Sequence, residues 1–447
     1  MEIQEEITIV MPVYQPGEYL RPCLESLLKQ TFRDFCLICI DDASPDDSHS
    51  MLQEYAKKDS RIVAWRNPYH LGAARTRNIG IQMAQGKYLI VLDADDYFES
   101  NYLEELYKKI EDTEADIVIC TFYWRSEETK QEFPLHLPAQ IKKYVKQPFT
   151  PIYIGKYFFQ IISDVPFCKI MKLDYIRNNQ FEFQDLENSN DVYFSQLSAL
   201  KARKIAYIDK PLIHYRFNLS STSKSISSKR GKNPMCFYYA IEKIYEILIS
   251  DPKYKVFLRS FHDRVILGLN NSLSLATNEE KEKTVQFLLN EGFKNLSMTK
   301  LKENDFLTIS AYLNWNHIIN YGFIELRDAD FVYELFFEEI MTYGKTFALW
   351  GYGKDGKKFL NMAKKYNFPI REIYDCDSQK WDDTQVPPIK DFSLRNHQVD
   401  TIIYTNPTFS KEISDRVQSE GANVRLVDYV LFELLNIIGT SETYEDE

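Results

Sequence analysis

Hydrophobic and polar positions divide the chain into three parts. From residue 7 to about 120, short apolar runs rich in β-formers alternate with amphipathic stretches of helical spacing. This alternation predicts βαβ units around a mostly parallel sheet. Helical spacing from Cys236 to about Tyr343 predicts a spacer of roughly five helices. The β rhythm returns at residue 346, which indicates a second, smaller α/β domain.

A polar stretch marks the first domain boundary. Residues 218–233 are rich in Ser and Lys and read as a loop or linker. The length of 447 residues also favours two or three domains, because single cores stop growing near about 250–300 residues. We therefore expect an α/β domain at 1–225, a helical spacer or acceptor region at 226–344 and a small Rossmann-like α/β domain at 345–440.

Charge and cysteine content exclude several classes of protein. The net charge of −11 argues against binding of long nucleic acid. Seven scattered cysteines do not form the framework of a secreted disulfide-rich domain. The N-terminus is acidic and its apolar run is interrupted by Pro12, so we expect no signal peptide. These features predict a cytoplasmic protein and leave peripheral attachment at the inner face of a membrane open.

Two acidic clusters follow strand-like runs. Asp93, Asp95 and Asp96 end the run KYLIVLDADD, and Asp41 with Asp42 ends the preceding long strand. In open parallel sheets, ligands bind beyond the carboxyl ends of the strands. Carboxylates there suit Mg²⁺ or Mn²⁺ that also holds phosphate, although an acidic turn that caps the next helix is an equal alternative.

Two arginines lie between the acidic clusters. Gly72 permits a close backbone turn, and Arg75 and Arg77 follow it in the segment GAARTRN. The planar guanidinium fork suits a diphosphate because it can bond two oxygens at once. Either arginine alone could instead be a structural partner of the aspartates.

These segments, in order, resemble the family-2 glycosyltransferases with the GT-A fold. The resemblance covers roughly the first 220 residues, about half of the chain. Seven landmarks carry it: MPVY at 11–14, DDAS at 41–44, GAARTRN at 72–78, LDADD at 92–96, FCKIMKLDYI at 167–176, NDVYF at 190–194 and KPLIHYR at 210–216.

The resemblance implies a binding site for a UDP-sugar donor. Residues after the first strand and in the DD pair would hold the uracil, with Asp42 favoured over Asp41. Asp95 would be the direct metal ligand, and Asp93 would serve the ribose or an outer contact. The nucleotide-sugar site implied by the family then comprises Pro12, Tyr14, Asp41, Asp42, Arg75, Arg77 and Asp93, and the metal set is Asp95, Asp93 and His214.

The resemblance also implies the catalytic base. The Asp of the family's E-D-x-x-F motif corresponds to Asp191, while Asn190 stands where the family usually has Glu. Glu187 could replace the lost carboxylate if residues 187–200 are helical. His214 occupies a position that is a metal ligand in some members, although a lone His after a strand is more often a packed, hydrogen-bonded residue.

With these residues in their family roles, the resemblance implies a metal-dependent, inverting transferase. Asp191 would take a proton from an acceptor hydroxyl as its oxygen attacks the anomeric carbon, with Mn²⁺ or Mg²⁺ and the arginines neutralising the departing UDP. The acceptor would be a glycan, glycolipid or glycoprotein, as in synthesis of a surface polysaccharide or a protein-linked glycan. The sugar, the linkage and a homo-oligomeric state stay open.

A glycine motif opens the predicted C-terminal domain. Gly351, Gly353 and Gly356 have G-x-G-x-x-G spacing after a strand-like run, and Asp375 follows at the end of the next one. This order fits half of a dinucleotide-binding fold, with the glycines close to a pyrophosphate. The segment lacks a complete second half, so a docking or stabilising domain is the favoured interpretation and a nucleotide site is the alternative.

Two other functions remain as alternatives. A nucleotidyltransferase also uses acids at strand ends, but it would require a Gly-rich, Lys-bearing loop near residue 12, which MPVYQPGEYL lacks. A nucleotide-binding or assembly scaffold with an inactive transferase half is the second alternative. Retention of Asp42, Asp95, Arg77 and Asp191 argues against such decay.

Overall fold

The chain, in a computed structural model, divides into two compact units. The first comprises Met1–Leu307 and the second Thr308–Glu447. The division falls inside the expected spacer 226–344, and the helices before it belong to the first unit. The described residues are 5–126, 132–135, 137, 139–217, 233–274, 276–307, 309–321, 337, 341, 344–351, 354–374, 399–404, 413, 416–417, 419–420 and 424–428.

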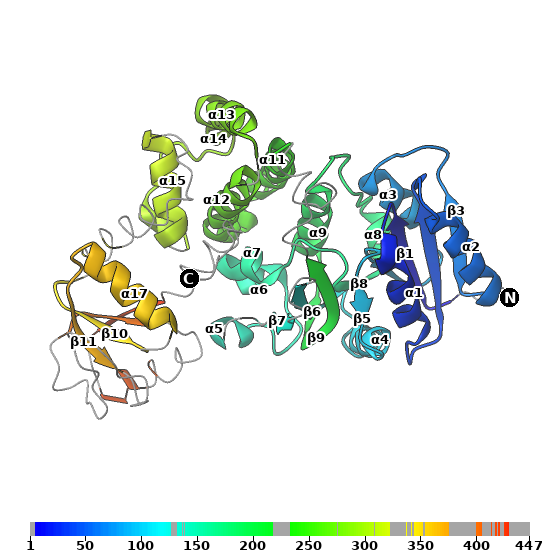
Figure 1. Cartoon of the computed structure of the whole chain (residues 1–447), viewed down its shortest axis with the longest axis horizontal. Coiled ribbons are helices and arrows are strands. Elements are labelled where there is room, and N and C mark those ends of the chain that lie inside the picture. Colours follow the sequence, from blue (N-terminus) through cyan, green and yellow to red (C-terminus); the bar gives the residue numbers. More distant parts are fainter. Residues whose placement is uncertain are drawn as a thin grey trace. The chain divides into compact units, whose positions relative to one another are not determined.

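A large sheet forms the centre of the first unit (Figure 1). Its strands run in the order β3-β2-β1-β4-β8-β6-β9-β5, and β7 pairs with β6. The pairs β1–β2, β2–β3, β1–β4 and β6–β9 are parallel, whereas β8 is antiparallel to both of its neighbours. The strands are β1 Ile7–Val13, β2 Phe35–Asp41, β3 Ile62–Arg66, β4 Tyr88–Val91, β5 Tyr97–Phe98, β6 Ile117–Ser126, β7 Glu132–Pro134, β8 Lys169–Lys172 and β9 Ile205–Phe217.

The predicted alternation of strands and helices is confirmed in this half. The strand β1 is almost entirely buried, which explains its continuous apolar run. The longer helices between the strands are α1 Leu20–Leu28, α2 Ser48–Lys58, α3 Ala73–Met83, α4 Tyr102–Thr113, α8 Leu173–Asn178 and α9 Asn190–Lys201. Helices α1 and α4 bury one apolar face each, as the amphipathic spacing predicted, whereas α9 is buried on most sides.

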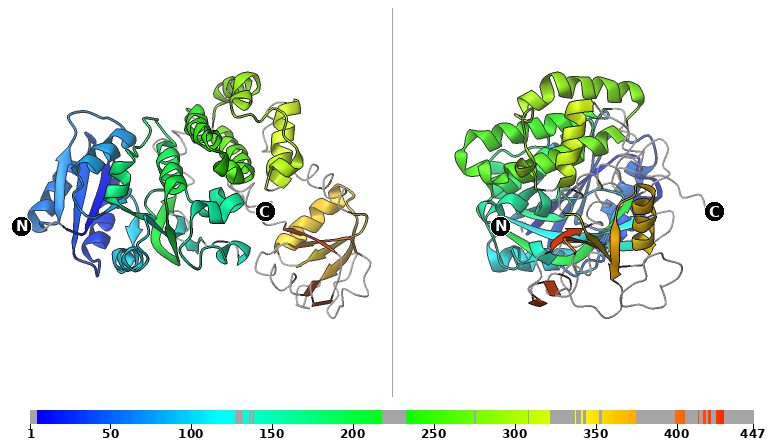
Figure 2. Two further views of the ribbon diagram at one scale, coloured as in Figure 1. Left: turned by 180° about the vertical axis from the view of Figure 1, so that it is seen from behind. Right: turned by 90° about the vertical axis from the view of Figure 1, so that its left-hand side faces the viewer.

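Helices extend the first unit beyond the sheet. Helix α9 packs on α11 (Met235–Ser250), and α11 packs on α12 (Leu258–Ser274). The three helices lie side by side in the views of Figures 1 and 2. Helix α13 (Asn278–Phe287) and the one-turn α14 (Phe293–Asn295) follow. No helix in the described ranges is long and apolar enough to cross a membrane.

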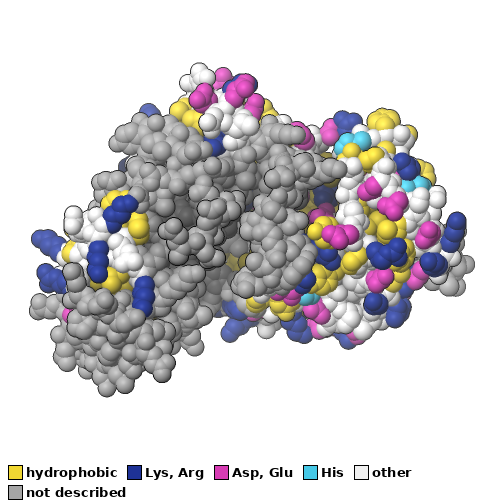
Figure 3. All heavy atoms as spheres, in the orientation of Figure 1, with side chains coloured by type: hydrophobic (Ala, Val, Ile, Leu, Met, Phe, Trp, Pro, Cys, Tyr) yellow, Lys and Arg dark blue, Asp and Glu magenta, His cyan; other side chains and the backbone are white. Residues whose placement is uncertain are grey.

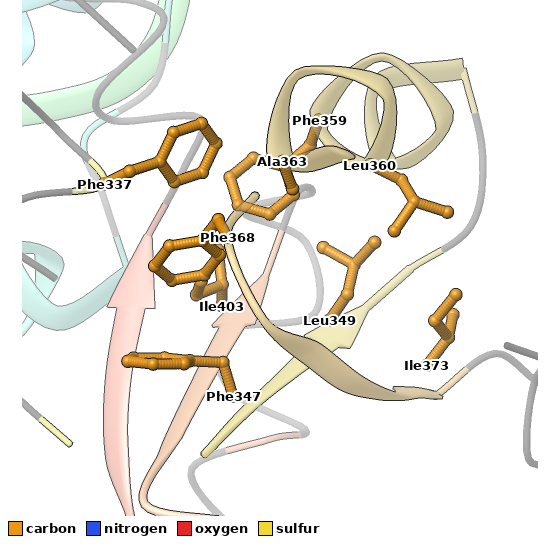
Figure 4. Packing of buried hydrophobic residues seen from close by; sticks show 9 residues of the cluster. All are labelled: Phe337, Phe347, Leu349, Phe359, Leu360, Ala363, Phe368, Ile373 and Ile403. Atoms are coloured by element: carbon orange, nitrogen blue, oxygen red, sulfur yellow. The ribbon is translucent and has the colours of Figure 1, made fainter. Parts of the chain in front are cut away.

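The second unit contains a four-stranded parallel sheet. Its order is β11-β10-β12-β13, with β10 Phe347–Trp350, β11 Ile370–Tyr374, β12 Thr401–Tyr404 and β13 Arg425–Asp428. Helix α17 (Lys354–Lys365) covers one face, where Phe337, Phe347, Phe359 and Phe368 share one core (Figure 4). The parallel strands fit the returning β rhythm, while a Rossmann-like domain with the bounds 345–440 stays a prediction. Helix α15 (Ile309–Tyr321) also belongs to this unit.

Candidate active site

The strand ends β2, β1 and β4 meet at one edge of the large sheet. Strand β1 lies between β2 and β4 and is parallel to both. Val13 pairs with Asp41, and Asp93 follows the end of β4 by two residues. The first strand and both acidic clusters therefore lie along one edge, as the sequence predicted.

Asp42 is buried and engaged by the loop that follows β3. Its Oδ1 accepts hydrogen bonds from Asn67 Nδ2 at 2.7 Å and from the Leu71 backbone N–H at 2.9 Å. Its Oδ2 accepts from the Gly72 N–H at 2.8 Å and lies 2.8 Å from His70 Nδ1. Both oxygens are thus occupied by the protein, and contact with a nucleobase stays a prediction for this residue.

Asp41 is equally buried but has fewer partners. Its Oδ1 accepts from the Ser44 N–H at 3.2 Å, and its Oδ2 lies 3.3 Å from Arg66 Nε and 3.9 Å from His49 Nδ1. Neither contact gives Oδ2 a well-aligned hydrogen bond. Of the two carboxylates, Asp41 retains the unused acceptor capacity, which the sequence did not indicate.

Aromatic side chains are exposed beside this pair. Tyr14, 39% exposed, stacks on His70 with the ring centroids 4.0 Å apart. Pro12 lies within β1 and pairs with Ile40. Since His70 also contacts Asp42, the exposed Tyr14 ring is fixed next to the end of β2.

The acidic turn after β4 has two chemically different sides. The Asp95 side chain is exposed, yet the surrounding protein and then the charge of Asp93 raise its pKa to about 6. Asp96 points inward, is fully buried, and accepts the Arg216 backbone N–H at 3.0 Å. Burial, followed by the charge of Asp95, raises the pKa of Asp96 well above its usual range.

Arg77 links the acidic turn to helix α9. Only 8% exposed, it donates from one nitrogen to Asp93 Oδ1 at 2.6 Å and from the other to Asn190 Oδ1 at 2.7 Å. The guanidinium also lies 5.1 Å from the centroid of the Phe183 ring. Arg75, in contrast, is exposed and bonds Asp185, with 2.9 Å from Nε to Oδ2. The two arginines therefore have different surroundings.

The predicted base, Asp191, lies in the first turn of α9. It is partly exposed and follows Asn190, the residue that holds Arg77. Helix α9 begins at Asn190, so the condition that would let Glu187 replace the missing carboxylate is not met, and Glu187 is exposed before the helix. The side-chain amide of Asn190, which stands where the family usually has Glu, accepts the hydrogen bond from Arg77.

His214 is held between two glutamates. Its Nε2 lies 3.0 Å from Glu99 Oε1 and its Nδ1 lies 3.1 Å from Glu132 Oε1. The ring also stacks on Tyr97 and Tyr123, at 4.2 and 4.8 Å between centroids. Both ring nitrogens are thus engaged by carboxylates, as in the packed, hydrogen-bonded alternative.

Sequence reasoning did not single out two cations at this edge. Arg216 lies over the rings of Tyr19 and Tyr97, at 4.8 and 4.9 Å, and its charge opposes the rise in the pKa of Asp95. Lys169 is completely buried and donates to the carbonyls of Ser163 and Val165 at 2.6 and 2.5 Å. Both lie inside the landmarks KPLIHYR and FCKIMKLDYI, which was the available signal.

A cavity of about 340 Å³ lies beside the middle of β6. Helix α7 (Phe158–Ile161) and the residues after it form one wall, where Asp164 pairs with Arg264. Asp164 also accepts from Gln196 Nε2 at 2.6 Å. Most of the residues that line the cavity are apolar, among them Ile119, Phe122, Leu135, Phe159, Ile162 and Tyr207.

The donors fit a hard divalent cation only in part. Asp93 and Asp95 offer carboxylate oxygens. Desolvation by the surrounding protein and then the charge of Asp93 raise the pKa of Asp95, and a cation would favour the ionised form of this carboxyl. No cluster of three or more His, Cys, Asp or Glu side chains suited to a metal occurs in the part of the chain that the structure describes. Oxygens of a substrate diphosphate or water would have to complete the shell.

The predicted C-terminal nucleotide site is described only in part. Gly351 has φ +97°, and its N–H donates to the Tyr374 carbonyl at 2.8 Å. Gly356 is buried within α17. Gly353 and Asp375 lie outside the described residues, so this site stays a prediction.

Comparison with known proteins covers the same half of the chain. A family model described as Glycosyl transferase family 2 matches residues 8–178. "Putative glycosyltransferase EpsH" of Bacillus subtilis is 31% identical over 236 residues, which cover 52% of this chain and 67% of that protein. Glycosyltransferase GlyA of Streptococcus pneumoniae is 28% identical over 51% of this chain, but only 33% of that protein is covered.

Solved structures are also similar. The structure of S. aureus TarS residues 1–349 in complex with UDP-GlcNAc matches with a TM-score of 0.47 and 17% identity. The match covers 83% of this chain and 95% of that one. Taken with the strand ends described above, the sequence matches establish that this chain belongs to glycosyltransferase family 2, with the GT-A fold in its first unit.

Proposed function

We propose that the chain transfers a sugar from a UDP-sugar to a hydroxyl group of a glycan acceptor, with inversion at the anomeric carbon. The observation that carries this proposal is the bridge made by Arg77. It joins Asp93, on the donor side, to Asn190, which directly precedes the proposed base. The motifs that resemble family 2 support the UDP-sugar. We place its uracil at Pro12, Tyr14 and Asp41 rather than Asp42, since the protein already bonds both oxygens of Asp42.

The reaction is a single displacement. Asp191 accepts the proton of the acceptor hydroxyl while its oxygen forms a bond to the anomeric carbon. The bond from that carbon to the UDP oxygen breaks on the opposite face, and UDP leaves with the bonding electrons. Holding both reactants in line supplies much of the rate enhancement, because a bimolecular step becomes effectively unimolecular.

Asp93 and Asp95 would hold Mg²⁺ or Mn²⁺ together with the donor diphosphate. Such an ion supplies positive charge that stabilises a leaving diphosphate. Desolvation and then the charge of Asp93 raise the pKa of Asp95, and a bound cation would stabilise the ionised forms of both carboxyls. Arg216 supplies positive charge from the protein at the same turn.

The acceptor side is proposed to include the cavity beside β6. Lys169 binds the carbonyls of Ser163 and Val165 in the cavity's wall segment, and Asp191 is one of the carboxylates whose charge acts on it. The buried ammonium group of Lys169 therefore interacts both with the cavity wall and with the proposed base. The apolar lining suits the non-reacting part of an acceptor.

A donor screen tests the proposal. The full chain is incubated with UDP-glucose, UDP-galactose, UDP-GlcNAc and GDP-mannose, with Mn²⁺, with Mg²⁺ and with a chelator, and nucleotide release is measured. We expect release of UDP from at least one UDP-sugar and its loss with the chelator. Turnover of GDP-mannose alone would overturn the choice of nucleotide.

The base is tested by one substitution and its matched control. Asp191→Asn should lower transfer by about a thousandfold, because the proton then has no acceptor, while UDP binding measured by calorimetry stays near wild type. Asp185→Asn changes an exposed carboxylate on the preceding loop in the same way and should change transfer far less. Wild-type turnover of Asp191→Asn would remove this residue from the mechanism.

A further inference from the structure

One stretch of the first unit has an unusual charge. No Asp or Glu occurs between Glu132 and Asp164, while Lys142, Lys143, Lys146 and Lys156 fall within it. The whole chain has 65 acidic residues and a net charge of −11, so this stretch opposes the overall charge. Elsewhere, on the face of the first unit seen in Figure 3, basic and acidic side chains are interspersed.

A second segment adds to the same surface. The 3₁₀ helix η3 (Pro252–Phe257) packs on α6 (Pro151–Ile154) and on the turn η2 (Gly155–Tyr157). A Cβ placed on Gly155 would approach a methyl of Val256 within 2.9 Å, which shows how closely the segments lie. We call the five exposed lysines of these segments the basic surface: Lys143, Lys146, Lys156, Lys253 and Lys255.

Little negative charge compensates the basic surface. Lys253 pairs with Asp251 at 2.7 Å. Among the described residues, no ion pair involves Lys143, Lys146, Lys156 or Lys255, although Lys142 next to them pairs with Asp209. Four adjacent ammonium groups are therefore available to an anionic partner.

Apolar side chains are exposed among these lysines. Ile152 is 44% exposed, Tyr153 61% and Val256 41%. Tyr144 lies 6.0 Å from Tyr153 between ring centroids, which brings the segment that carries Lys143 and Lys146 next to α6. We call Ile152, Tyr153 and Val256 the apolar tip.

We infer that the basic surface and the apolar tip together dock the protein on a membrane that contains anionic lipids. Lysines near a bilayer are attracted to anionic headgroups, aromatic rings favour the interface, and aliphatic side chains enter the acyl boundary. A soluble polyanion would use the lysines but would leave Ile152, Tyr153 and Val256 in water. The mixture of charge and exposed apolar groups therefore favours the bilayer.

Docking is independent of the proposed reaction, so its test needs no turnover. The full chain is centrifuged with vesicles of phosphatidylcholine alone or of phosphatidylcholine with phosphatidylglycerol. We expect binding to the anionic vesicles only. The variant Lys146→Glu/Lys156→Glu/Lys255→Glu should weaken it by about a hundredfold or more, since each lysine near the surface contributes about fivefold.

A matched control keeps the net charge change equal. Lys57→Glu/Lys294→Glu/Lys300→Glu reverses three exposed lysines outside the basic surface and should bind far more tightly than the first variant. The variant Ile152→Ser/Tyr153→Ser/Val256→Ser should weaken binding most at high salt, where apolar insertion remains. Thermal unfolding of each variant verifies that it folds.

Three outcomes would overturn the inference. The first is equal or no binding to both kinds of vesicle. The second is an equal loss in the control variant, which would show a general effect of charge. The third is tight binding of inorganic polyphosphate with no effect of the apolar substitutions on vesicle binding, which would identify a soluble polyanion as the partner.

Discussion

The two sheets of this chain differ in what lies at their strand ends. At the edge of the first sheet, charged side chains from distant segments bond one another, as Arg77 does with Asp93 and Asn190. At the described edge of the second sheet, the contact is between backbone groups: the Gly351 N–H, just after β10, donates to the carbonyl of Tyr374 at the end of β11. The core of the second unit is apolar and aromatic.

The difference indicates where ligand chemistry belongs. Buried charges are costly unless they are paired and hydrogen-bonded, so a fold does not need them to be stable. The first sheet nevertheless concentrates Asp41, Asp42, Asp96 and Arg77 at one edge in a buried state. The second unit has apolar cores, and its described residues include no comparable cluster of buried charges. We therefore expect the charged edge to serve ligand binding, in addition to the local stability that its hydrogen bonds supply.

Among the changes that compare the two sheets, we expect the largest effect from breaking the Arg77 bridge at the first edge. Arg77→Met removes two hydrogen bonds and leaves Asp93 without its cation, so kcat/KM should fall by about a hundredfold with the fold retained. Arg75→Met removes only an exposed ion pair, and kcat/KM of this variant should fall by less than about fivefold. Steady-state kinetics of both variants decide which arginine serves the reaction.

The companion substitution Asn190→Glu sharpens this result. It would give Arg77 a second carboxylate partner and restore the charge that family 2 usually has there. We expect a lower affinity for the donor, because the positive charge of Arg77 is then neutralised before the diphosphate arrives. Equal effects of Arg77→Met and Arg75→Met would contradict the role assigned to the bridge.

The second prediction concerns stability at the same edge. Asp42→Asn replaces an oxygen that accepts hydrogen bonds with an amide that cannot, which leaves donors from the 67–72 loop unpaired. The free energy of unfolding should drop by about 2–3 kcal/mol. The control Asp47→Asn alters an exposed residue that caps α2 without a side-chain hydrogen bond and should cost below about 0.5 kcal/mol. Urea titration measures both, and equal losses would contradict the assignment.

Local sequence patterns predicted the strands that form the first edge but not the hydrogen bonds between its side chains. The continuous apolar runs of β1, β2 and β4 are a direct result of burial on both faces, so their positions could be read from the sequence. Residues after strand ends could likewise be assigned to the edge, as Asp93 and Asp95 were. The bond from Arg77 to Asn190 spans 113 positions and depends on packing that no local pattern contains.

The same limit applies to Asp42 and to the helices. The identity of the carboxylate gives no sign that the following loop would occupy both of its oxygens. The spacing of α11 and α12 predicted helices, but not that they pack with the first unit. Tertiary contacts decide both points, and they lie outside the reach of periodicity.

The third prediction tests how the helices are tied to the first unit. Burial raises the pKa of Asp164, but the charge and hydrogen bond of Arg264 and the bond from Gln196 outweigh it, so the pKa lies below its usual value. A depressed pKa contributes stability above the ordinary pKa of about 4, and this contribution is lost as pH falls through the folded value. The free energy of unfolding of Asp164→Asn should therefore be about 2 kcal/mol lower than that of wild type at pH 7.

The pH dependence separates this pair from general destabilisation. The difference in unfolding free energy between wild type and Asp164→Asn should shrink as pH falls below about 4, because the wild-type carboxylate is then protonated too. Asp209→Asn removes a carboxylate that pairs with Lys142 near the surface and should show a smaller difference. A difference that does not vary with pH would contradict the ion pair as its source.

The smallest effect is expected at the second edge. Gly351 adopts φ +97°, which other L-residues rarely adopt, so Gly351→Ala should destabilise the second unit by about 1 kcal/mol. Hydrogen exchange of β10 and β12 should accelerate while UDP release by the first unit stays unchanged.

Calorimetric titration of the full-length wild type with NAD, UDP-glucose and S-adenosylmethionine completes the comparison. Heat from any of the three that Gly351→Ala abolishes would show that the second edge also binds a nucleotide, and the contrast between the two sheets would then lie in the kind of ligand.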